Sequence, residues 1–107
     1  PTAPADVLIL PMTQDLTPAI RLATRLRSAG VRTQLYTEQK KFKAKMSYAD
    51  KLGIPYVILI GEDEIAENVV AVKNMTTGEQ TKLGFADAAS LIKNDMDDRA
   101  RAAVIKE

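Results

Sequence analysis

The stretch FKAKMSYADKLGIPYVILIGEDE, residues 42–64, is the part of the sequence from which the fold is best deduced. Its first half carries apolar residues at helical spacing. Gly53 follows the expected last turn, where a left-handed residue commonly ends a helix, and Pro55 prevents the helix from continuing. The apolar run 56–60 has the length of a buried strand, and acidic residues follow at 62–64. The stretch therefore predicts a basic helix, a tight turn, a buried strand and an acidic loop. The apolar positions of the helix are Phe42, Met46, Ala49 and Leu52.

Two more strands and a helix are predicted before this stretch. The apolar run 6–10 indicates a second buried strand, and the alternation over 31–36 indicates a half-buried strand at a sheet edge. Between them, Thr17 supplies a capping hydroxyl and Pro18 a suitable first helical residue. The helix that they begin is expected to end near Ala29.

Two strands and a last helix are predicted after the acidic loop. The strands 69–73 and 80–83 are separated by a turn signal at 76–78, and the helix begins near Phe85. The stretch 97–107 either extends this helix or forms a tail. Strands joined by helices must be parallel, whereas the short turn makes the fifth strand antiparallel to the fourth. The sequence thus predicts an α/β fold: a three-layer α/β/α sandwich with a mixed five-stranded sheet.

Length and composition indicate one globular domain. The chain has 107 residues, of which 46% are hydrophobic, and a formal net charge of +1. Any contact with nucleic acid must therefore depend on a local basic patch. The sequence has neither a signal-peptide pattern nor an apolar run long enough to span a membrane. Because it begins with proline, we expect a piece of a longer protein: a linker remnant at 1–5, a domain at 6–96, and the helical extension or tail at 97–107.

The residue types that most catalytic and metal sites require are missing. Histidine and cysteine are both absent, which removes the commonest general base, the strongest nucleophile and the preferred ligands of transition metals. The loop after the first strand, PMTQD at 11–15, contains no glycine, unlike a phosphate-cradling loop. We therefore expect no catalytic residue, no metal site and no cofactor in this chain.

Two charged segments are open to more than one interpretation. Residues 40–51 contain five lysines, and several fall in the first turns of the predicted helix, where they suit a phosphate but also an ordinary solvated face. Glu62, Asp63, Glu64 and Glu67 gather where the central strand ends. Carboxylates there could accept hydrogen bonds from an unstacked base, or simply form a polar loop.

Taken together, these residues resemble the carboxyl-terminal anticodon-binding domain of class II aminoacyl-tRNA synthetases, most closely that of the histidyl-tRNA synthetases. The resemblance extends over about residues 5–96. It rests on a chain-long series at the right spacing: Phe42-Lys43, Ala49-Asp50-Lys51 with Gly53, Gly61-Glu62 with Glu64, Val72-Lys73, and Gly78-Glu79-Gln80-Thr81.

This resemblance implies binding to the anticodon stem-loop of histidine tRNA. Glu64, in the family's G-x-x-E motif, would contact an anticodon base, and Lys40 and Lys43 would contact phosphates. The loops after the first two strands would line the same site, with Met12, Thr13, Gln14, Glu38 and Gln39.

The resemblance also implies a larger parent protein. Its catalytic domain, on the same polypeptide, would bind ATP with magnesium and act as a histidine–tRNA ligase. The parent would be a cytoplasmic homodimer.

Two other classes of protein compete with this interpretation. One is a synthetase-like regulatory or protein-interaction domain that no longer reads tRNA. The other is a small doubly wound enzyme or receiver domain, which would need an acidic cluster after the first strand. Only Asp15 is acidic there, which disfavours the receiver.

Overall fold

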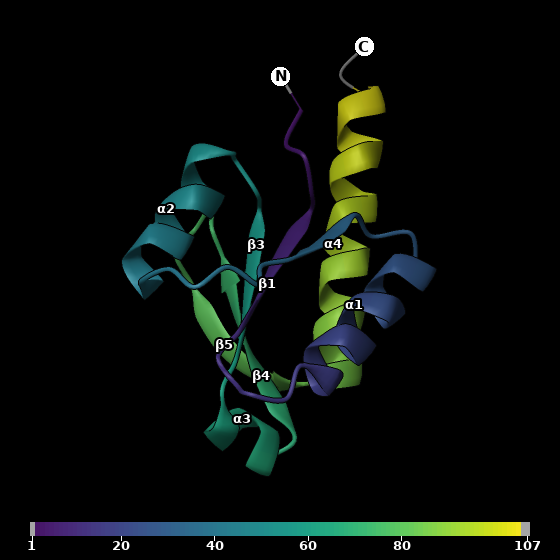
Figure 1. The fold of residues 1–107 in the computed structure, drawn as a ribbon. Helices are drawn as coiled ribbons and strands as arrows, with labels where there is room; N and C mark the ends of the chain where they lie inside the picture. The colour runs from purple at the N-terminus through teal and green to yellow at the C-terminus, as the bar shows by residue number, and fades with distance from the viewer. Residues whose placement is uncertain (1, 106–107) are drawn as a thin grey trace.

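The structure, a computed structural model that describes residues 2–105, is built on one mixed five-stranded sheet (Figure 1). Its strand order is β2-β1-β3-β4-β5. β1 pairs in parallel with both β2 and β3, whereas β4 is antiparallel to β3 and to β5. The predicted mixed sheet is confirmed. The strands are β1 (Val7–Pro11), β2 (Thr33–Leu35), β3 (Tyr56–Ile60), β4 (Val69–Asn74) and β5 (Gln80–Gly84).

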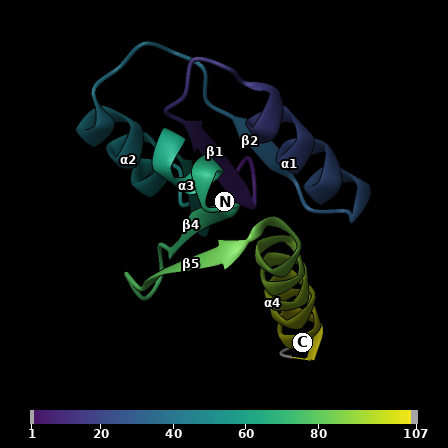
Figure 2. The ribbon, with the colours of Figure 1, turned by 90° about the horizontal axis from the view of Figure 1, so that it is seen from below.

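Helices cover both faces of this sheet, which confirms the three-layer arrangement (Figure 2). The long helices α1 and α4 lie on one face, and α2 lies on the other. A fourth helix, α3, follows β3 at the end of the sheet (Figure 1). The helices are α1 (Thr17–Ser28), α2 (Phe42–Lys51), α3 (Glu62–Ala66) and α4 (Phe85–Ile105). Within residues 2–105, no helix is long and apolar enough to cross a membrane.

The strands β1 and β3 are apolar throughout because both of their faces are covered. In β1, Val7 and Ile9 pack into the core beneath α1 and α4, whereas Leu8 and Leu10 pack into the core beneath α2. All four side chains are fully buried. The shared parallel direction of β1, β2 and β3 brings their carboxyl ends, and the segments that follow, to one edge of the sheet.

The expected cap at the start of α1 is wrong. Thr17 is the first helical residue and makes no cap of its own. Asp15 Oδ1 instead accepts hydrogen bonds from the Thr17 backbone N–H at 3.0 Å and from the Thr17 hydroxyl at 2.7 Å. A carboxylate is the better acceptor at this site, because it also faces the positive end of the helix dipole.

The acidic loop after β3 is also corrected, since Glu62–Ala66 forms helix α3. Its first turn holds three acidic residues, which the helix dipole stabilises. Phe42 was assigned to the apolar face of the basic helix, but it is 46% exposed. Phe42 is the first residue of α2 and lies beyond the part of the helix that packs on the sheet. The residues of α2 that pack there are Met46, Tyr48 and Ala49.

The extents of β2 and α4 bear on two further predictions. The edge strand β2 covers only 33–35 of the predicted 31–36. The strand is half-buried as predicted, but all three of its residues are partly buried rather than alternately buried and exposed. Helix α4 continues without a break through 97–105, so this part extends the helix; residues 106–107 and residue 1 of the expected linker lie outside the described residues.

Candidate nucleic-acid interface at the carboxyl edge of the sheet

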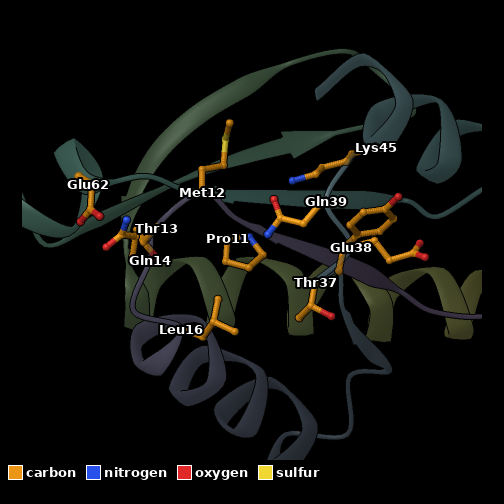
Figure 3. A pocket seen from close by; sticks show the side chains of 11 residues that line it. Pro11, Met12, Thr13, Gln14, Leu16, Thr37, Glu38, Gln39, Lys45 and Glu62 are labelled. Atoms are coloured by element: carbon orange, nitrogen blue, oxygen red, sulfur yellow. The ribbon is translucent and has the colours of Figure 1, made fainter. Parts of the chain in front are cut away.

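A cavity of about 630 Å³ opens at the carboxyl ends of β1 and β2 (Figure 3). This volume is within the range of sites that hold a drug-sized ligand, so one unstacked nucleotide would fit. Five of the predicted site residues line it together: Met12, Thr13, Gln14, Glu38 and Gln39. The remaining lining residues are Pro11, Leu16, Tyr36, Thr37, Lys45 and Glu62.

Backbone hydrogen bonds hold the two loops that form this cavity. The Met12 N–H donates to the Ile60 carbonyl at 2.8 Å, which ties the exit of β1 to the end of β3. The Tyr36 N–H donates to the Ile9 carbonyl at 2.9 Å and so ties the exit of β2 to β1. Because rigid strands anchor both loops, their polar side chains are presented in a defined arrangement.

A tyrosine and a lysine form one side of the cavity. The Tyr36 ring packs edge-on against the ring of Tyr48 from α2, with 5.3 Å between the ring centroids. The Lys45 ammonium lies 5.7 Å from the centroid of the Tyr36 ring, at cation–π distance. A phenol is neutral at physiological pH and can donate a hydrogen bond. Burial, followed by the negative charge of Glu38, raises the pKa of the Tyr36 phenol still further from that range.

Three lining residues were not among the predicted site residues: Tyr36, Lys45 and Glu62. A signal for Tyr36 was present, because it is the last residue of the alternating stretch and so had to lie near the carboxyl edge. Lys45 is one of five lysines in its segment. Only the seating of α2 on the sheet shows which of them turns toward the cavity.

Glu64 does not line the cavity. Its Oε1 accepts a hydrogen bond from the Gly61 N–H at 2.7 Å, across the start of α3. Its Oε2 lies 3.9 Å from Lys82 Nζ, and the Glu64 side chain is only 20% exposed. One carboxylate oxygen therefore holds the start of α3, while the other faces β5.

The two predicted phosphate contacts, Lys40 and Lys43, are exposed and lie outside the cavity lining. Lys40 precedes α2 and Lys43 is in its first turn. Both are thus on the side of the cavity where α2 begins. Within residues 2–105, no group of three or more acidic residues is placed to hold a metal ion.

The fold is that of a known class of tRNA-binding domain. A family model described as "Anticodon binding domain" matches residues 6–95, and the chain belongs to this family. The form of the domain that it matches is the one found in histidine–tRNA ligases. The chain is 44% identical over 90 residues to the histidine–tRNA ligase from Clostridium tetani, and the match covers 84% of this chain and 20% of the relative. The histidine–tRNA ligase from Pyrococcus furiosus is 36% identical over 90 residues, and the match covers 83% of this chain and 21% of the relative.

Solved structures show the same similarity. The histidyl-tRNA synthetase from Nostoc sp. PCC 7120 superposes with a TM-score of 0.80 at 32% identity, covering 87% of this chain and 23% of that one. The apo histidyl-tRNA synthetase from S. aureus superposes with a TM-score of 0.74 at 33% identity, and the match covers 85% of this chain and 24% of that one. The chain therefore spans about a fifth to a quarter of the length of these relatives.

Proposed function

We propose that this domain binds the anticodon stem-loop of histidine tRNA and presents it for aminoacylation by a catalytic domain of the same polypeptide. The observation that carries the proposal is the cavity itself, which gathers polar side chains from the segments after β1, β2 and β3. The catalytic domain would use ATP with magnesium, and the parent protein would be a homodimer in the cytoplasm.

Base recognition in this proposal uses hydrogen bonds more than stacking. Amide and carboxylate groups of Gln14, Gln39 and Glu38 line the cavity beside the Tyr36 phenol. Aromatic residues are only 5% of the chain, too few for the stacking platforms that bind single strands without sequence preference. These polar side chains give selectivity, because a base that cannot hydrogen-bond to them would cover them and leave them unpaired.

Affinity would come partly from phosphates. Lys40 and Lys43 stand at the start of α2, near the cavity and open to solvent. A net charge of only +1 is consistent with few phosphate contacts. Each such contact adds about one unit to the magnitude of the slope of log K against log salt, so the slope should be small.

Glu64 remains a proposed base contact, but only through one oxygen. Its Oε1 is used by the Gly61 N–H, and Oε2 is left to accept a hydrogen bond from a base beside Lys82. The same side chain also acts on the cavity indirectly, because it fixes Gly61, the residue before the cavity-lining Glu62.

Binding of the 107-residue chain to a histidine-tRNA anticodon stem-loop tests the proposal. The matched ligand is the same stem-loop with a changed anticodon, and both are titrated at two salt concentrations. We expect tighter binding of the histidine stem-loop at both. Equal, weak binding that disappears with salt would contradict base recognition and would favour a domain that only interacts with proteins.

Two variants separate the kinds of contact. Lys43→Met should weaken both stem-loops by the same factor and lower the salt slope by about one unit. Gln14→Ala should weaken the histidine stem-loop more than the changed one. An unchanged salt slope for Lys43→Met would mean that this lysine is a solvated surface residue.

A further inference from the structure

The lysine of the cavity, Lys45, is placed differently from the other lysines of its segment. It is half-buried, whereas Lys40, Lys41, Lys43 and Lys51 are exposed. None of the ion pairs formed within residues 2–105 involves it. Its ammonium instead lies 5.7 Å from the centre of the Tyr36 ring, which in turn packs on Tyr48. Its donors are thus held in place without being paired to a carboxylate.

Gln39 reaches the same space from the loop after β2. Figure 3 shows the Lys45 and Gln39 side chains both pointing into the middle of the cavity, above Pro11, whereas the carboxylates of Glu38 and Glu62 lie toward its opposite ends. A ligand in the middle of the cavity therefore meets the ammonium and the amide together.

We infer that Lys45 and Gln39 read the edge of one anticodon base and select a keto base, guanine or uracil, over an amino base, adenine or cytosine. This inference rests on the proposed function and specifies the chemistry of its site. Guanine and uracil present a carbonyl acceptor beside a ring N–H donor on the pairing edge. Adenine and cytosine present an amino donor beside a ring nitrogen acceptor.

The physical reason for the selectivity lies in Lys45. A glutamine amide carries a donor at one end and an acceptor at the other, and it can turn to suit either kind of base. An ammonium has three donors and no acceptor, so an ammonium that faces the exocyclic group of the base matches a carbonyl and cannot match an amino group. The selection therefore requires Lys45 at the exocyclic group and Gln39 at the neighbouring ring nitrogen. Lys45 thus decides between the two classes, and Gln39 completes the contact with the ring N–H.

The anticodon that pairs with the histidine codons in the genetic code, GUG, consists of keto bases only. Selection of a keto base therefore favours this anticodon at any of its three positions. It disfavours every anticodon that places an amino base in the cavity.

The test uses the full chain and stem-loops that differ by one base. Each guanine of GUG is replaced in turn by 2,6-diaminopurine, which exchanges the carbonyl for an amino group, and the uracil is replaced by cytosine. We expect one of these changes, at the base that enters the cavity, to weaken binding about tenfold or more. Equal binding of all three changed loops and the original would overturn the inference.

Three variants assign the effect to Lys45. Lys45→Met keeps the length of the side chain without its donors and should bind the original and the changed loop equally. Lys45→Arg keeps a donor and should retain the preference. Lys43→Met, on the exposed face of the same helix, should weaken both loops by one factor. A preference that survives in Lys45→Met would overturn the inference, provided that the unfolding midpoints show all three variants to be folded.

A stem-loop carrying UGU, which is keto-only but not a histidine anticodon, separates this inference from the proposed function. Equal binding of GUG and UGU, with amino bases rejected, would contradict the proposed histidine specificity and leave the selection of keto bases standing. Preference for GUG over UGU, with amino bases tolerated, would contradict the inference alone. Absence of all binding to stem-loops would overturn both.

Discussion

Replacing Glu64 by alanine tests the part that this side chain plays at the start of α3. In the structure, Glu64 Oε1 accepts a 2.7 Å hydrogen bond from the Gly61 N–H, an amide that the first turn of α3 cannot satisfy. Loss of one such capping contact costs about 1 kcal/mol. For a domain of this size, that free energy corresponds to a fall in the melting temperature of about 4–8 °C.

Glutamine at the same position provides the matched control. Its side-chain oxygen can accept the same hydrogen bond, so Glu64→Gln should retain most of the stability that Glu64→Ala loses. Removal of the charge also removes the pair with Lys82, but that contact is 3.9 Å long and Lys82 is 56% exposed. A pair of this kind is worth a few tenths of a kcal/mol at most.

A second substitution acts on the same hydrogen bond from the other side. A Cβ atom at Gly61 would lie 2.5 Å from Glu64 Oε1, so Gly61→Ala must push the carboxylate away from its donor. The two substitutions should therefore not add: Gly61→Ala should destabilise the parent domain more than it destabilises the Glu64→Ala variant.

Thermal and urea unfolding of five proteins, followed by circular dichroism, measure these differences: the parent, the three single variants and the double variant Gly61→Ala/Glu64→Ala. If Glu64→Gln is destabilised as much as Glu64→Ala, the negative charge of Glu64, and not its capping hydrogen bond, stabilises the domain. Fully additive effects of Gly61→Ala and Glu64→Ala would refute the shared hydrogen bond. Binding of Glu64→Gln to the histidine stem-loop then tests the base contact separately: a weakening confined to that stem-loop, in a protein of unchanged stability, is expected.

Three further predictions concern the rest of the domain. Leu22→Ala should cost about 2–5 kcal/mol in urea unfolding, whereas Ile20→Ala, half-exposed on the same helix, should cost less than about 0.5 kcal/mol; equal costs would contradict the packing of α1. Burial, then the hydrogen bond to Asp95, raises the pKa of Tyr56 to about 12. The contribution of the neutral phenol to the free energy of unfolding should therefore be complete below pH 10 and disappear toward pH 12. The difference in free energy of unfolding between the parent and Tyr56→Phe should narrow over that window. Hydrogen bonds from the Thr17 backbone and hydroxyl lower the pKa of Asp15, so Asp15→Ala should melt lower than the parent at neutral pH and converge with it only as pH falls through the lowered pKa; a gap that persists in acid would contradict the charged cap.

The order of strands and helices was predictable because each element carries its own period. The unbroken apolar runs in β1 and β3 reflect burial on both faces, whereas the mixed sequence of β2 goes with partial burial of all three of its residues. Gly53, at a φ of +70°, ends α2 where the sequence placed the end. The start of α1 and the nature of α3 were not predictable to the same degree, because competing acceptors such as Asp15 and Thr17 differ only in geometry.

The place of the candidate site was predictable in outline for a topological reason. Once the first three strands are parallel, the loops that follow them must share one edge, and five residues of the first two loops do line one cavity. The role of a single side chain within that edge was not predictable. Glu64 was expected to contact a base, and nothing in the sequence indicated that one of its oxygens also accepts a hydrogen bond from the Gly61 N–H.

The sequence by itself determined the class of fold and the edge of the sheet that the first loops share, because apolar periodicity and turn residues act locally. The family resemblance came from a separate signal, the series of matched residues along the chain. Only the tertiary structure decided which lysine of 40–51 enters the cavity. That choice depends on how α2 seats Ala49 and Tyr48 against the sheet, which rotates Lys45 toward Tyr36 and leaves Lys43 in water. Long-range packing sets this rotation, and the local charge pattern of the five lysines does not encode it.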